Sequence, residues 1–105
     1  MTNLDWPGAL ADIDYIRKHF EGNSKSVSIM GFCMGGALSL AALTKMPFKA
    51  GGVFYGIPDL NIFRLDQITA KVIGHFGRLD PLKGFSDAES AEKLAEDAKK
   101  YGYPI

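Results

Sequence analysis

The feature that most constrains this chain is a cysteine set between glycines, where a short apolar run changes into a helical pattern. The run Ser28–Phe32 leads to Cys33, and Met34-Gly35-Gly36 opens the next segment. This arrangement is typical of a nucleophile elbow, a sharp strand-to-helix turn with the reactive residue at its centre. Glycines flank such a turn because a Cβ there would collide with the neighbouring strand or helix. The turn strains the backbone of its central residue and lifts that side chain above the sheet edge.

The elbow context predicts that Cys33 is a nucleophile. Unpaired N–H groups at the start of the following helix favour an anion beside the thiol. The backbone N–H of Met34 is therefore expected to stabilise an oxyanion, together with a second N–H from an earlier loop. The alternative is a small residue buried at a tight turn, because free cysteine is among the most buried residue types.

Composition favours one globular domain in a reducing compartment. The chain has 105 residues, of which 47% are hydrophobic, and twelve basic residues balance twelve acidic ones. No basic surface is therefore predicted for nucleic acid or anionic lipid, and we expect a small-molecule or protein partner. The single cysteine excludes an internal disulfide. Neither a signal peptide nor a membrane-length apolar run is recognisable, so a cytoplasmic protein is expected.

The hydrophobic spacing predicts three helices and three strands in alternation. A loop that could hold one helical turn is expected at residues 57–69. The last helix is expected to begin at a capping box, Ser86-x-x-Glu89, and to end at Gly102. The other predicted helices cover residues 6–22 and 34–45, and the predicted strands cover residues 27–30, 50–56 and 71–76.

This order of elements predicts an α/β fold with parallel strands buried under helices on both faces. Three strands make a small sheet with two open edges, although their side chains are typical of buried strands. We therefore interpret residues 1–105 as a single partial domain.

A thiol nucleophile needs a base, usually a histidine that a carboxylate orients. Asp80 is the best-placed carboxylate, because it lies in the loop that follows the C-terminal end of the third predicted strand. Active sites of α/β proteins are usually formed by such loops. Its alternative is an ordinary turn aspartate before proline. Asp59 and Asp66 are weaker candidates. No histidine suits the base: His19 falls near the end of the first helix, and His75 lies within a strand and precedes Asp80.

No residue cluster has the spacing of metal ligands, and the glycines near Cys33 lack the lysine of a phosphate-binding loop.

The stretch Gly31-Phe32-Cys33-Met34-Gly35-Gly36 resembles the elbow of the dienelactone hydrolase family, carboxymethylenebutenolidases on the α/β-hydrolase fold. Phe54-Tyr55-Gly56, Gly77-Arg78-Leu79-Asp80 and Tyr101-Gly102 resemble the same family in the same order. The resemblance covers about the middle of that family's domain.

The resemblance implies a partial α/β-hydrolase fold and a cofactor-free hydrolase of small lactones or esters. It implies that Cys33 is the nucleophile and Asp80 the triad acid. It places the family's early strands before Met1 and its catalytic histidine beyond Ile105.

Other interpretations stay open at this point. One is a catalytically silent truncated domain that associates with itself or another chain through its open sheet edges. Another is a thiol-based redox or interaction module that uses Cys33 alone.

Overall fold

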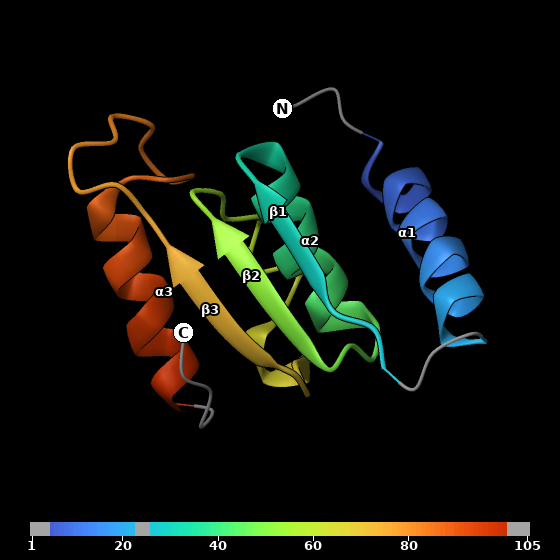
Figure 1. The fold of residues 1–105 in the computed structure, drawn as a ribbon. Coiled ribbons are helices and arrows are strands. Elements are labelled where there is room, and N and C mark those ends of the chain that lie inside the picture. Colours follow the sequence, from blue (N-terminus) through green and yellow to red (C-terminus); the bar gives the residue numbers. More distant parts are fainter. Residues whose placement is uncertain (1–4, 23–25, 101–105) are drawn as a thin grey trace.

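The computed structural model describes residues 5–22 and 26–100, which form an open parallel sheet with three α-helices (Figure 1). The sheet has the strand order β1-β2-β3. Its strands are β1 (Ile29–Phe32), β2 (Ala50–Phe54) and β3 (Lys71–His75). The helices are α1 (Trp6–Glu21), α2 (Met34–Lys45) and α3 (Ala88–Lys100), with a 3₁₀ turn η1 (Leu65–Gln67).

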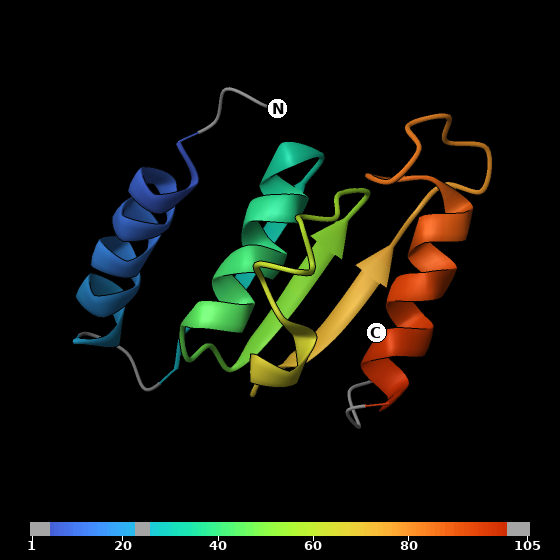
Figure 2. The same ribbon diagram turned by 180° about the vertical axis from the view of Figure 1, so that it is seen from behind.

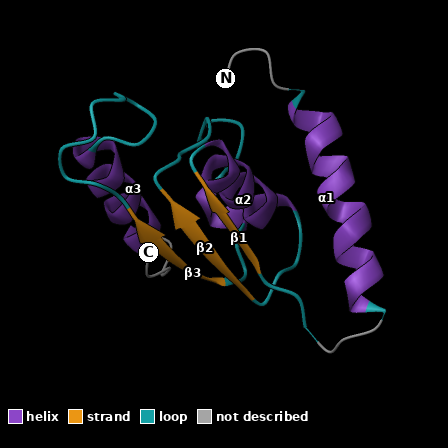
Figure 3. Cartoon of the chain, turned by 45° about the horizontal axis from the view of Figure 1, so that its top comes forward, coloured by secondary structure: helices purple, strands orange, loops and turns teal. Residues whose placement is uncertain are grey.

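All three strands run in the same direction, so their carboxyl ends meet at one edge of the sheet (Figure 3). The register aligns Phe32 with Phe54, and Phe54 with His75. The loops that follow β1 and β3 contain Cys33 and Asp80. The fold thus places both sequence candidates at the same edge of the sheet.

The core lies between the sheet and the helices α2 and α3. Helix α2 lies close to the strands, and Gly51 of β2 permits this approach because it has no side chain. A Cβ at Gly51 of β2 would come within 2.4 Å of Leu43 Cδ1. The largest fully buried hydrophobic side chains come from α2, β2, the segment after η1 and α3: Leu40, Leu43, Val53, Ile68 and Leu94.

The helices cover only one face of the sheet, and the expectation that both faces would be buried is wrong. Helix α2 lies behind the strands in Figure 1 and in front of them in Figure 2. On the uncovered face, Met30 is 64% exposed, Phe32 51% and Ile73 63%. Right-handed crossovers that move across a sheet in one direction put their helices on one face. The order β1-β2-β3 never reverses, so no helix within residues 5–22 and 26–100 covers the opposite face.

Most predicted elements are confirmed, and α2 has the predicted bounds. Helix α1 begins after Asp5, whose side chain accepts from Gly8 N at 3.1 Å, and ends before the C-cap Gly22. One turn of 3₁₀ helix, η1, occupies the loop at residues 57–69. Strand β1 lies two residues later than predicted, because Gly31 and Phe32 pair with Val53 and Phe54.

The start of α3 corrects the predicted capping box. Asp87, and not Ser86, caps the helix: its carboxylate accepts from Ser90 N at 3.2 Å and from Gly84 N at 2.7 Å. The Ser86 hydroxyl is buried without a hydrogen-bond partner among the described residues. Gly102, the predicted end of this helix, lies outside the described residues.

Within residues 5–22 and 26–100, no helix combines the length and the apolar character needed to cross a bilayer.

Candidate active site at the Cys33 turn

Cys33 is the single residue between β1 and α2, and its backbone conformation is strained. Its φ is 57° and its ψ is −122°, a combination that L-residues rarely adopt. The Cys33 N–H donates to Phe54 O at 3.0 Å, and its carbonyl accepts from Gly36 N and Ala37 N. These bonds tie the turn to β2 on one side and to α2 on the other. The side chain is left exposed.

Three glycines make room for this turn. A Cβ at Gly31 would lie 2.0 Å from Gly35 O, and one at Gly36 would lie 2.4 Å from Phe54 O. Gly56 is the third of these glycines, since a Cβ added there would lie 2.0 Å from Cys33 O. Gly35 differs, because a Cβ there would meet nothing within 4 Å. The predicted steric role thus holds for Gly31 and Gly36 but not for Gly35.

Met34 is the first residue of α2, and its N–H therefore has no acceptor within the helix. It directly follows Cys33, so its donor belongs to the same turn as the thiol. The dipole of α2 adds positive potential at this end. The Met34 N–H and the positive end of the α2 dipole would both stabilise an anion formed beside Cys33.

Asp80 lies in the loop after β3, where it forms a local turn. Its carboxylate accepts from Leu82 N at 3.0 Å, and its own N–H donates to Gly77 O at 3.3 Å. The side chain is half-buried. β2 separates the strand that leads to Cys33 from the strand that leads to Asp80. Among the described residues, no hydrogen bond joins the two side chains.

Neither histidine of the chain lies at the turn. His75 ends β3 on the uncovered face, with its ring stacked on Phe54 at a centroid distance of 4.8 Å. His19 lies in the last turn of α1, at the opposite end of that helix from Trp6. Asp59 and Asp66 also make local contacts: Asp59 accepts from Asn61 N, and Asp66 pairs with Arg64.

Sequence reasoning missed two residues that support the turn. Tyr55 has a φ of 38°, and its N–H donates to His75 O at 2.8 Å, so the end of β2 is strained next to the strained Cys33. Ser39 is buried, and its hydroxyl donates to Gly35 O at 2.7 Å. The signal for Tyr55 was its place directly before Gly56. Nothing in the sequence distinguished Ser39 from other helix residues.

No group of three or more histidine, cysteine, aspartate or glutamate side chains is arranged to hold a metal ion in the described part of the chain. The arrangement at Cys33 is an exposed thiol beside an unused N–H and a helix N-terminus. Such a site can attack a carbonyl carbon and stabilise the resulting oxyanion.

Comparison with known proteins identifies a family and two relatives. The model of the dienelactone hydrolase family matches residues 5–105. A Bradyrhizobium protein that carries the name 2-oxo-3-(5-oxofuran-2-ylidene)propanoate lactonase is 26% identical over 116 residues. A Saccharolobus solfataricus protein that carries the name carboxymethylenebutenolidase is 36% identical over 61 residues.

Both relatives are much longer than this chain. The first match covers 96% of this chain and 47% of the relative. The second covers 58% of this chain and 23% of the relative. The chain thus spans less than half the length of the proteins it resembles.

Proposed function

Because this chain belongs to the dienelactone hydrolase family, we propose that it is the nucleophile-bearing part of a hydrolase that opens small lactones or esters through Cys33. The observation that supports this proposal is the strained, exposed Cys33 at the start of α2. Strain of this kind is retained where the surrounding structure enforces it, and it is concentrated at reactive sites. The name of the Bradyrhizobium relative supports a lactone as the substrate class.

The proposed reaction begins when the Cys33 thiolate attacks the carbonyl carbon and forms a C–S bond. The carbonyl oxygen becomes an oxyanion, which the Met34 N–H stabilises. The ring C–O bond then breaks, and the released oxygen takes a proton from the protonated base. Water attacks the thioester, gives one proton to the base and releases the carboxylic acid and the Cys33 thiolate, so the thiolate and the protonated base are restored.

Asp80 has the role of orienting that base in this proposal. A carboxylate that binds one nitrogen of a histidine fixes its tautomer and stabilises its protonated form. The histidine is supplied from outside residues 5–100, since His75 is stacked on Phe54 and His19 lies at the far end of α1. This chain alone is therefore expected to be a slow enzyme.

A chimera tests the proposal in a complete domain. Residues 5–100 replace the matching segment of the Bradyrhizobium lactonase, and hydrolysis of a dienelactone is followed by ultraviolet absorbance. We expect turnover by the chimera, and a loss of several powers of ten in kcat/KM for Cys33→Ala within it. Asp80→Asn should reduce kcat while the fold, followed by circular dichroism, is retained. Turnover that Cys33→Ala leaves unchanged would contradict the mechanism.

The uncovered sheet face favours a second candidate function, that of a catalytically silent module that associates with itself. Apolar side chains of β1 and β3 are exposed there, and among the described residues no strand pairs with the outer edges of β1 and β3. Exposed patches and edges of this kind promote association between chains. A chain that is monomeric at all concentrations and melts cooperatively would contradict this candidate.

A further inference from the structure

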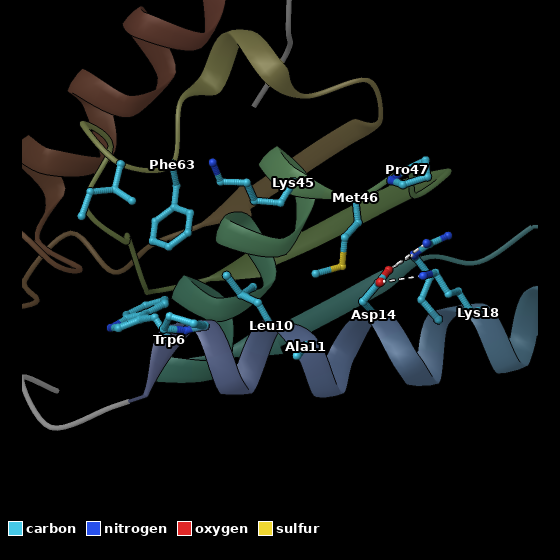
Figure 4. Close-up of a pocket in the computed structure, with 12 residues that line it drawn as sticks. Trp6, Leu10, Ala11, Asp14, Lys18, Lys45, Met46, Pro47 and Phe63 are labelled. Carbon is cyan, nitrogen blue, oxygen red and sulfur yellow. Dashed lines mark hydrogen bonds and ion pairs between the residues drawn. The ribbon is translucent and has the colours of Figure 1, made fainter.

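A groove of about 670 Å³ lies between α1 and the C-terminal end of α2, away from the Cys33 turn (Figure 4). None of the residues that line it belongs to residues 31–36 or to the loop at residues 77–84. Its volume falls in the range of roughly 300–1,000 Å³ typical of small-molecule sites. The groove therefore has room for a ligand that the Cys33 site does not require.

The walls of the groove are apolar and partly aromatic. Figure 4 shows Trp6 and Phe63 at one end of the groove. Their ring centroids are 5.5 Å apart. Leu10 of α1 and Met46 after α2 continue the apolar surface between the two helices. An apolar body placed here would contact aromatic and aliphatic side chains on both sides.

The charged side chains of the groove leave one cation without a carboxylate partner. Asp14 accepts from Arg17 at 2.8 Å and from Lys18 at 3.1 Å, and Arg17 also donates to Glu21. Lys45 has no carboxylate within ion-pair distance among residues 5–22 and 26–100. Its Nζ lies 5.9 Å from the centroid of the Phe63 ring, beside the aromatic end.

We propose that this groove binds an amphipathic monocarboxylate, whose carboxylate accepts from Lys45 Nζ and whose apolar body lies against Trp6, Leu10 and Phe63. The charge complementarity selects an anion, because the other cations of the groove are already paired with carboxylates. The lining selects an apolar body over a sugar or a nucleotide. The site is independent of the proposed hydrolase activity, since it shares no residue with the elbow.

Trp6 is the only tryptophan of the chain, so its fluorescence reports on this groove directly. Octanoate is the probe, and octanol is its neutral counterpart. We expect octanoate to produce a saturable change in Trp6 fluorescence at lower concentrations than octanol does. Equal affinities, or no change with octanoate, would overturn the proposal.

Two pairs of variants locate the carboxylate. Lys45→Gln should weaken octanoate binding about threefold to tenfold, as for a partly exposed charge-assisted contact, and leave octanol binding unchanged. Lys49→Gln, which removes an exposed lysine outside the groove, should have no effect. Ala11→Glu places a negative charge in the groove at an exposed helix position and should weaken octanoate binding about tenfold, whereas Ala11→Gln should not. An affinity that Lys45→Gln and Ala11→Glu leave unchanged would overturn the proposal.

Amide shifts in ¹H–¹⁵N spectra distinguish this groove from the uncovered sheet face. Shifts confined to the amides of α1, Lys45, Met46 and residues 62–63 are the expected result. Shifts on Met30, Phe32 and Ile73 instead would assign octanoate to the sheet and overturn the proposal.

Discussion

Gly56 has no side chain, and the Cys33 turn depends on this absence. The carbonyl of Cys33 accepts two bonds from α2 and occupies the space that a Gly56 Cβ would need. Gly35, only two residues from Cys33, has open space around the same position. Of these two glycines, the packing of the turn therefore requires Gly56 and leaves room for a side chain at Gly35.

Substituting each glycine by alanine separates these contributions. Gly56→Ala should lower the free energy of unfolding by about 1–3 kcal/mol, because the new methyl group forces the Cys33 carbonyl to move. Gly35→Ala should raise it by about 0.5–1 kcal/mol, because alanine restricts the unfolded chain and fits a helix. Urea unfolding followed by circular dichroism measures both. A destabilised Gly35→Ala or an unchanged Gly56→Ala would contradict the packing described for the turn.

At the residue scale, the sequence predicted what lies next to Cys33 along the chain but not what lies next to it in space. The glycine spacing indicated the elbow because strand, turn and helix are consecutive. The strain at Tyr55 and the contact with Gly56 come from β2, which is distant in sequence and adjacent only after the strands pair. The roles of Cys33, Met34 and Asp80 stay predictions, since the described geometry is compatible with them without testing them.

At the element scale, the start of α3 is held by a single carboxylate. The pKa of Asp87 is lowered from its ordinary value of 3.8, chiefly by a hydrogen bond with the Ser90 side chain, and burial opposes this shift. The hydrogen bonds from the backbone N–H groups of Ser90 and Gly84 lower the pKa further. A lowered pKa in the folded chain means that the ionised form stabilises the fold. This contribution is complete above the unfolded pKa and is lost as the pH falls through the folded one.

Asp87→Asn keeps a capping oxygen but removes the charge. We expect its melting temperature to lie below that of the parent chain at neutral pH, and the difference to disappear as the pH falls below about 4. Glu92→Gln removes a charge from the same helix away from its start and serves as the control. Thermal melts over a series of pH values provide the measurement. A difference for Asp87→Asn that persists or grows in acid would contradict the assigned role of Asp87.

Element types were predictable because their periodicities are local, whereas some boundaries were not. The bounds of α2 were predicted correctly, because an alanine-rich run follows the Cys33 turn and Pro47 limits the end of the helix. The capping-box pattern at Ser86 and Glu89 competed with the aspartate at the next position, which reaches two backbone donors instead of one. β1 was placed too early because Gly31 is a poor strand former, whereas in the sheet Gly31 and Phe32 pair with Val53 and Phe54.

At the scale of the whole molecule, the sheet is covered on one face and bare on the other. Phe32, Phe54 and His75 form a row of stacked rings across the bare face, with Phe32 and Phe54 centroids 4.6 Å apart. Parallel sheets are normally covered on both faces. We therefore expect this face to bring two chains together.

Charge on the bare face should separate the chains. Met30→Lys combined with Ile73→Lys is expected to shift sedimentation towards the monomer, because buried ammonium groups would be costly at the contact. Leu79→Lys is the control, since Leu79 is 92% exposed but lies in the loop after β3. Sedimentation of the parent chain as a monomer over the whole concentration range would rule out association through this face.

The α/β class was predictable from the alternation of strands and helices, but the bare face was not. Which face a crossover helix covers depends on the spatial order of the strands, and no local pattern encodes that order. The strand residues carried the apolar character of a sheet buried on both sides. That character led to the prediction of helices on both faces of the sheet, whereas the strand order places them on one face.

The unbroken strand order also has a consequence in time. Each strand pairs with the strand that precedes it in the chain, so a polypeptide that emerges from the ribosome can add its strands one after another. The bond from Cys33 N–H to Phe54 O needs nothing beyond β2. The thiol can therefore reach its strained position before Asp80 has left the ribosome.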